Sequence, residues 1–150
     1  MNPIAEADLK FGLEAEKIIK KHLEETFGNL IKTEDPYHNL DFYNDKVYVE
    51  FKRRRCNYGQ YPDLMFELCK IEKGLELIEE GYRIFFVWGC NNGCYYWELK
   101  EKDKEYFKAL GGRSDRGRNE YKILAHIKTK YIKPLLSDSL LDPPLHISCS

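Results

Sequence analysis

The chain has 150 residues and a formal net charge of -1, with 43% hydrophobic, 14% aromatic and 33% charged residues. This composition excludes a disordered or fibrous protein, and the length favours one compact core. The longest apolar run, Ile84 to Trp88, is far too short to span a membrane, and the amino terminus lacks the pattern of a signal peptide. We therefore expect an intracellular protein, in the cytoplasm, nucleoid or nucleus, that makes no contact with a membrane.

Cysteines and basic residues set two further limits. The five cysteines are odd in number and irregularly spaced, which favours reduced thiols over a disulfide framework. A net charge near zero gives no overall attraction to nucleic acid, so DNA binding would depend on local basic clusters. Two such clusters occur, namely Lys52 with Arg53, Arg54 and Arg55, and Arg113, Arg116 and Arg118 followed by Lys122, Lys128, Lys130 and Lys133.

Apolar residues at helical spacing predict a first helix over residues 3–27. Asn2 and Pro3 are typical of a helix start, and Gly28 is typical of a helix end. Glu16 falls among the apolar residues of one helix face, which are Leu9, Leu13, Ile19, Leu23 and Phe27. A carboxylate on a buried face needs a partner, so Glu16 is either a functional acid or a surface residue that misses this face by a fraction of a turn.

The stretch LDFYNDKVYVEFKRRR, residues 40–55, predicts a β-hairpin with its turn at Asn44 and Asp45. This turn would pair Tyr43 with Lys46, Phe42 with Val47, and Asp41 with Tyr48. Because side chains alternate along a strand, one face would then carry Leu40, Phe42, Val47, Val49 and Phe51. The other face would carry Asp41, Tyr43, Tyr48, Glu50 and Lys52. Two acids and a lysine therefore share one face of an otherwise apolar hairpin.

The rest of the chain predicts alternating helices and strands. A second helix is expected from Pro62 or Asp63 to Gly81, then a buried strand over 82–89, a turn at 91–93 and an antiparallel strand over 94–100. A short helix over 102–110, a basic loop and a strand over 121–128 follow. We expect one domain over residues 1–133 and a weakly ordered carboxy-terminal tail over residues 134–150.

This order of elements, with Asp41 followed by Glu50, Phe51 and Lys52 as Asp-x8-Glu-x-Lys, resembles the PD-(D/E)XK nuclease superfamily. Upstream, Gly12-x3-Glu16-x2-Ile19-x3-Leu23 is similar to the first helix of Holliday-junction-resolvase-like members. Leu40 stands where the name of the motif has proline, a residue that many members lack. The resemblance implies an α/β restriction-endonuclease-like fold of three layers, with a central mixed sheet flanked by helices in an αβββαβ core.

The hairpin acids are suited to bind a cation. Glu50 and Lys52 are two residues apart on one strand, and Asp41 would lie diagonally across the hairpin, near enough for both carboxylates to share an ion. Such hard oxygen ligands suit Mg²⁺, with Mn²⁺ as a substitute.

The resemblance implies a role for each of these residues. Asp41 and Glu50, with the backbone carbonyl of Val49 or Phe51, would hold one or two ions that bind the scissile phosphate and lower the pKa of a water. Lys52 would position that water or neutralise charge developing on the phosphate. Glu16 would orient a hydrated ion. Gln60 is a further candidate because related nucleases often place a glutamine after the motif lysine.

Both arginine clusters are candidate DNA contacts. Arg53, Arg54 and Arg55 directly follow the motif lysine and would lie at the mouth of the site, where phosphates pass. The segment GGRSDRGRNEYK, with Arg113, Arg116 and Arg118, predicts a second loop that contacts the DNA backbone.

These features favour a magnesium-dependent endonuclease that hydrolyses phosphodiester bonds in DNA. The resolvase-like first helix favours branched DNA such as a Holliday junction, which implies a homodimer with two sites. A small chain of this kind fits a phage, a virus or a mobile element, and no small-molecule cofactor is expected. One alternative is a non-catalytic nucleic-acid-binding module whose salt-sensitive binding ignores magnesium. A second alternative is a scaffold domain in which Asp41, Glu50 and Lys52 form a surface salt bridge.

Overall fold

A computed structural model of the protein describes residues 20–101, 105–111 and 122–135. In these residues a main sheet has the strand order β1-β2-β3-β5-β6-β9, and a small sheet has the order β4-β8-β7. The main sheet is built from β1 (Ile31–Lys32), β2 (Phe42–Tyr43), β3 (Val47–Arg53), β5 (Arg83–Cys90), β6 (Gly93–Leu99) and β9 (Lys133–Pro134). The small sheet is built from β4 (Asp63–Glu67), β7 (Tyr106–Gly111) and β8 (Lys122–Lys128). The described helices are α2 (Leu68–Glu79), the 3-10 helix η1 (Thr129–Tyr131) and a helical segment over residues 20–27.

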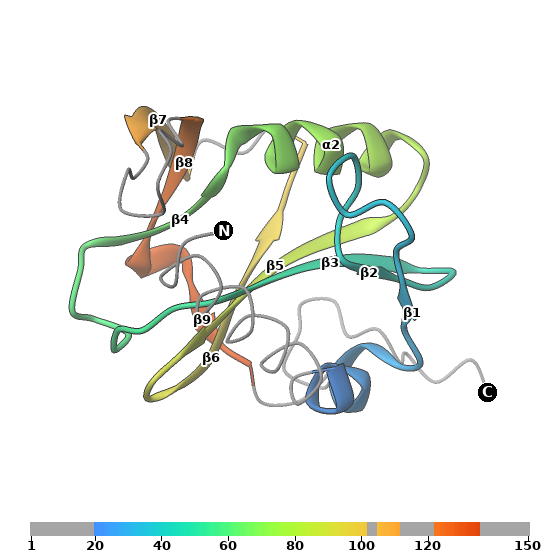
Figure 1. The fold of residues 1–150 in the computed structure, drawn as a ribbon, viewed down its shortest axis with the longest axis horizontal. Coiled ribbons are helices and arrows are strands. Elements are labelled where there is room, and N and C mark those ends of the chain that lie inside the picture. The colour runs from blue at the N-terminus through green and yellow to red at the C-terminus, as the bar shows by residue number, and fades with distance from the viewer. Residues whose placement is uncertain (1–19, 102–104, 112–121, 136–150) are drawn as a thin grey trace, which may run out of the picture.

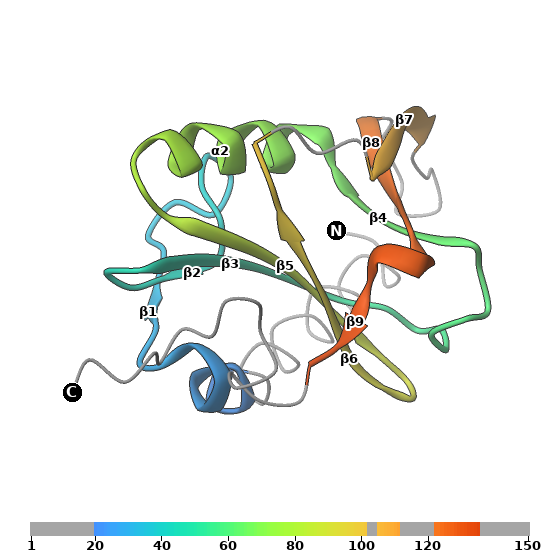
Figure 2. The same cartoon turned by 180° about the vertical axis from the view of Figure 1, so that it is seen from behind.

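The main sheet is mixed. Strand β3 is antiparallel to β2 but parallel to β5, and β5 is antiparallel to β6. A parallel pair needs a long connection between its strands, which β4 and α2 provide here. In Figures 1 and 2, α2 covers one face of the main sheet and the helix over residues 20–27 covers the other. The predicted three-layer α/β fold is confirmed.

Strand β5 supplies both cores of the domain. Phe86 and Trp88 are fully buried on the α2 side, whereas Phe85 and Val87 are fully buried on the side of residues 20–27. A strand covered on both faces needs apolar residues at every position, which explains the continuous run IFFVW. The predicted buried strand and its antiparallel partner are therefore confirmed.

Helix α2 lies unusually close to the main sheet. A Cβ added at Gly74 would come within 2.9 Å of Leu99 and 3.0 Å of Ile84, so any larger residue there would displace one of these side chains. The helix ends at Glu79, two residues before Gly81, which has a positive φ of 102° and confirms the predicted stop. This close approach brings Lys70, one turn before Gly74, down onto strand β3.

The register of the predicted hairpin was wrong by two residues. Phe42 pairs with Val49 and Tyr43 with Tyr48, and the turn is closed by a hydrogen bond from the Asn44 N–H to the Val47 carbonyl. The Asn44 side chain accepts hydrogen bonds from the backbone N–H groups of Lys46 and Val47, which favours this wider turn.

A shift of two residues leaves every side chain of a strand on its predicted face. The prediction fails for Leu40, which lies before β2. Leu40 packs in the core on the α2 side, whereas Phe42 packs in the core on the other side. The shift also changes the geometry of the acids, because it brings Asp41 directly opposite Glu50.

Two predicted helical stretches are strands. The residues predicted to begin the second helix form β4, where Leu64 and Phe66 alternate inward, and the short helix predicted over 102–110 is replaced by β7. Both strands pair along their full length with β8. These contacts join segments far apart in the sequence, so local helix spacing could not reveal them.

The ends of the described chain complete the fold. Residues 20–27 form the end of the predicted first helix, and Gly28 follows it with a φ of 83°. Pro134 pairs with Tyr95 in the main sheet, and Leu135 is buried. The remainder of the expected tail lies outside the described residues. No helix in the described part of the chain is long and apolar enough to cross a membrane.

Candidate active site

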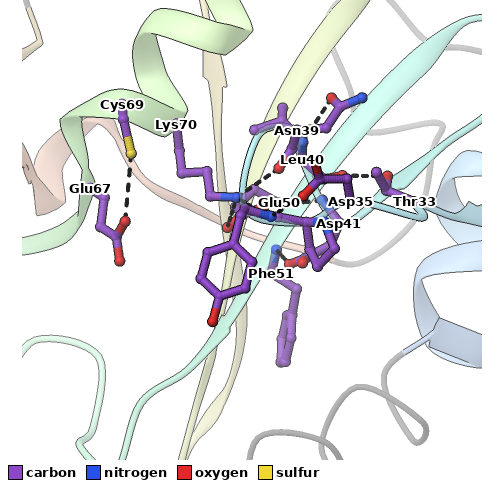
Figure 3. A network of polar contacts seen from close by, with 12 residues as sticks. Thr33, Asp35, Asn39, Leu40, Asp41, Glu50, Phe51, Glu67, Cys69 and Lys70 are labelled. Carbon is purple, nitrogen blue, oxygen red and sulfur yellow. Dashed lines mark hydrogen bonds and ion pairs between the residues drawn. The ribbon is translucent and has the colours of Figure 1, made fainter.

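Asp41 and Glu50 form a pair of buried carboxylates at the junction of β2 and β3. The backbone N–H of Asp41 donates a hydrogen bond of 3.0 Å to Glu50 Oε1. The backbone N–H of Phe51 donates one of 3.0 Å to Asp41 Oδ2. Each residue is only 8% exposed, and Figure 3 shows both in the middle of one polar network. The backbone therefore fixes the two acids face to face, closer than the diagonal arrangement that the sequence predicted.

This pair carries unfavourable electrostatics that a cation would relieve. Burial and the neighbouring Asp41 carboxylate raise the pKa of Glu50 well above its usual value. Two lysines approach the pair, with Lys32 Nζ 3.6 Å from Asp41 Oδ1 and Lys70 Nζ 3.9 Å from Glu50 Oε2. Adjacent, partly desolvated carboxylate oxygens are suitable ligands for Mg²⁺ or Mn²⁺. The donor set thus fits a hard divalent cation.

The carboxylates would not bind such an ion alone. Within residues 20–101, 105–111 and 122–135, no three His, Cys, Asp or Glu side chains converge to form a metal-binding group. Mg²⁺ is commonly held by one or two carboxylates, with waters and substrate phosphates as its remaining ligands. Asp41 and Glu50 match that requirement. Glu16, the third acid that the sequence suggested, lies outside the described residues.

Lys70 is a site residue that the sequence analysis missed. Its buried ammonium group reaches from α2 and donates hydrogen bonds to the backbone carbonyls of Pro36 and Asn39, the latter at 2.6 Å. It also contacts Glu50, as Figure 3 shows. Lys70 therefore ties α2 to the segment that precedes Asp41. The sequence did place Lys70 four residues before Gly74, on the buried face of the helix. A search for apolar residues at helical spacing overlooks a lysine in that position.

Lys52 lies two residues after Glu50 and on the same face of β3. Burial lowers the pKa of Lys52 to about 8, assisted by the charge of Arg54 and opposed by Glu67 and Glu50. Near neutral pH its side chain can thus be an ammonium group or a free amine. The ammonium form can donate hydrogen bonds to a phosphate and neutralise charge that develops on it.

Glu67 is the second missed residue and ends β4 just before α2. Its Oε1 accepts a hydrogen bond of 3.1 Å from Lys122 Nζ, and its Oε2 lies 3.5 Å from Cys69 Sγ. Burial opposes ionisation, but Lys122 and Lys52 together hold the pKa of Glu67 below its usual value. Glu67 therefore connects the small sheet electrostatically to Lys52.

In the first arginine cluster, Arg53 and Arg54 donate hydrogen bonds to backbone carbonyls of the protein itself. Arg53 donates hydrogen bonds to the carbonyls of Arg54 and Gly89, and Arg54 donates one of 3.1 Å to the carbonyl of Met65. Arg55 is exposed to solvent. Arg53 and Arg54 thus fasten β3 to β5 and β4.

The remaining candidates for DNA contact lie in loops. Gln60 is exposed, and its side chain accepts a hydrogen bond from the backbone N–H of Asn57 within its own loop. Arg113, Arg116 and Arg118 lie outside the described residues. Contact of any of these residues with DNA stays a prediction.

Comparison with known proteins identifies the family. The family model described as "Phage putative PDDEXK endonuclease" matches residues 7–135, a range that contains Asp41, Glu50 and Lys52. No curated protein and no solved structure matches the chain significantly. Because the family match spans most of the sequence and agrees with the mixed sheet, the chain belongs to this phage PD-(D/E)XK endonuclease family.

Proposed function

We propose that the protein is a metal-dependent endonuclease that hydrolyses phosphodiester bonds in DNA, with Asp41, Glu50 and Lys52 as its active site. The observation that carries this proposal is the buried carboxylate pair, held face to face by two backbone hydrogen bonds. The alternative of a surface salt bridge between Lys52 and these acids fits less well. The acids are buried, and the lysines that contact them are Lys32 and Lys70. Membership of a nuclease family supports the same reaction class.

Each residue of the site has a separate task in this proposal. Asp41 and Glu50 hold Mg²⁺ or Mn²⁺, and the backbone N–H groups of Phe51 and Asp41 keep the two carboxylates oriented. When bound, the ion would supply a site for the scissile phosphate and would lower the pKa of the attacking water. The Lys52 ammonium group neutralises negative charge that develops on the phosphate as the water oxygen attacks and the ester bond breaks. Lys70 keeps Glu50 and the Pro36–Asn39 backbone together.

The proposal extends to the substrate and the assembly. The resolvase-like pattern around Glu16 supports branched DNA, with Glu16 assisting the ion, and two incisions in a junction require a homodimer. Arg55, Gln60 and the arginines at 113, 116 and 118 are the proposed DNA contacts, together with Arg53 and Arg54 at the base of the site. An intracellular site of action, where phage or host DNA is found, completes the proposal.

A cleavage assay tests the proposed function. Supercoiled plasmid and a synthetic four-way junction are incubated with purified protein in Mg²⁺, in Mn²⁺ and in chelator, beside an Asp41→Asn, Glu50→Gln double variant. We expect cutting with either metal, none in chelator and none by the double variant, with faster cutting of the junction. Binding of DNA without cutting in either metal, equal for both proteins, would instead show a non-catalytic nucleic-acid-binding module.

A further inference from the structure

An exposed aromatic stack lies on the outer face of the small sheet. The Phe107 ring on β7 packs flat against the His126 ring on β8, with ring centroids 4.9 Å apart and an interplanar angle of 10°. Phe107 is 45% exposed, so the face of its ring away from His126 is open to solvent. A large apolar ring in this position gains nothing from the core, which lies on the opposite face of the sheet.

Contacts with the neighbouring strand β4 hold the stack in one orientation. His126 Nδ1 lies 2.8 Å from Asp63 Oδ1 on β4, which fixes the plane of the imidazole ring. His126 pairs with Met65, whose carbonyl accepts hydrogen bonds from Arg54 and Trp88 of the main sheet. The Phe107 ring therefore sits on a rigid support. Such preorganisation lowers the entropy cost of binding a ligand to it.

The stack lies a short distance from the proposed active site. Glu67, which acts on Lys52, pairs with Leu124, and Leu124 pairs with Ala109 on β7. Two strand spacings and two further residues along β7 separate Phe107 from Glu67, which is about 12 Å in all. In Figure 1 the small sheet lies beside the amino-terminal end of α2, which carries Lys70.

The charges around the stack fit a nucleic acid strand. Lys122 and Lys128 are exposed on the same face of β8 as His126, one on either side of it along the strand. One ring flanked by lysines matches one base and its phosphates. Stable protein partners bury much wider apolar surfaces than this.

We propose that the Phe107–His126 stack is a platform for one unpaired base of the DNA substrate, close to the scissile phosphate. The inference rests on the proposed function, which makes DNA the substrate, and it specifies DNA with unpaired bases near the cut. Stacking on an aromatic ring accepts any base, so the platform selects DNA structure rather than sequence.

Binding measured without cleavage tests the platform. Fluorescence anisotropy in chelator compares a blunt duplex with a duplex that carries a four-nucleotide single-stranded tail. We expect wild-type protein to bind the tailed duplex more tightly, and Phe107→Ala and Phe107→Leu to lose about 5- to 150-fold in affinity for it. Neither variant should change binding of the blunt duplex. Phe107→Trp should retain the preference, because it restores an aromatic face.

Ile123→Ala is the matched control, because Ile123 is a similarly exposed apolar residue, 47% exposed, at the start of β8. It should bind both duplexes like the wild type. Equal binding of the tailed duplex by Phe107→Leu and wild-type protein would overturn the platform, even if the enzyme cuts DNA. Conversely, a Phe107-dependent preference in a protein that cuts nothing would retain the platform and remove the proposed catalysis.

Discussion

Replacement of Lys52 by alanine is expected to abolish DNA cleavage while leaving the protein folded. Removal of one preorganised charge aimed at a developing negative charge typically lowers kcat by about 10²- to 10³-fold. The fold should tolerate the loss, because burial disfavours the charged form of Lys52 and lowers its pKa to about 8. Single-turnover cleavage and thermal denaturation measure the two effects. Unchanged turnover in Lys52→Ala would remove Lys52 from the mechanism.

The same lysine predicts a pH dependence. If the ammonium form acts on the phosphate, the cleavage rate should fall as the pH rises through about 8, where Lys52 loses its proton. The residual activity of Lys52→Arg should not fall there, because a guanidinium stays charged. A rate that instead rises to a plateau near pH 8 would mean that the free amine acts as a base. Lys46→Ala is the matched control, since Lys46 is exposed at the turn of the same hairpin.

Replacement of Glu50 by glutamine is expected to stop cleavage and also to make the metal-free protein more stable at pH 8. Glutamine keeps an oxygen that can accept the Asp41 N–H, and Lys70 keeps its bonds to the Pro36 and Asn39 carbonyls. The substitution removes a buried negative charge that faces Asp41. Gains from relief of such active-site strain are about 0.5–2 kcal/mol, or a rise in Tm of roughly 1–8 °C.

The sign of this effect follows from the raised pKa of Glu50. The folded protein binds the Glu50 proton more tightly than the unfolded chain does, so the free energy of unfolding falls as the pH rises above the usual value of 4.5. The stabilisation by Glu50→Gln should therefore be present at pH 8 and vanish near pH 4.5. Magnesium should raise the Tm of the wild type but not that of the variant.

A control of opposite sign is available on β6. Glu98 accepts hydrogen bonds of 2.8 and 2.9 Å from the guanidinium of Arg83, so Glu98→Gln should destabilise the protein at pH 8. If Glu50→Gln lowered the Tm at pH 8 as Glu98→Gln does, Glu50 would be a structural partner of Lys70 rather than a strained metal ligand.

The hairpin shows how far the sequence can predict this site. Asp41, Glu50 and Lys52 were grouped correctly on one face, because the actual register differs by two residues and so preserves alternation. Their exact separation depended on a turn whose hydrogen bonds come from the Asn44 side chain. The apolar run of β5 also allowed a correct prediction. A strand covered by helices on both faces has no need to alternate apolar with polar residues.

The residues that sequence reasoning missed depend on distant contacts. Strands β4 and β7 exist because both pair with β8, and β4 brings Glu67 to Lys122. Lys70 is buried only because the chain around Pro36 and Asn39 folds back over α2 and offers it two carbonyls. Such non-local partners leave no periodic signal in the helix or strand that supplies the side chain.

Isothermal titration calorimetry with Mn²⁺ at pH 8, without DNA, tests directly whether Asp41 and Glu50 bind a metal ion. We expect saturable binding by the wild type, a loss of at least tenfold in affinity in Asp41→Asn and in Glu50→Gln, and an unchanged affinity in Glu98→Gln. Each lost carboxylate removes one of the two protein ligands and half of the negative charge at the site. Equal Mn²⁺ affinity in all four proteins would contradict a metal site between Asp41 and Glu50.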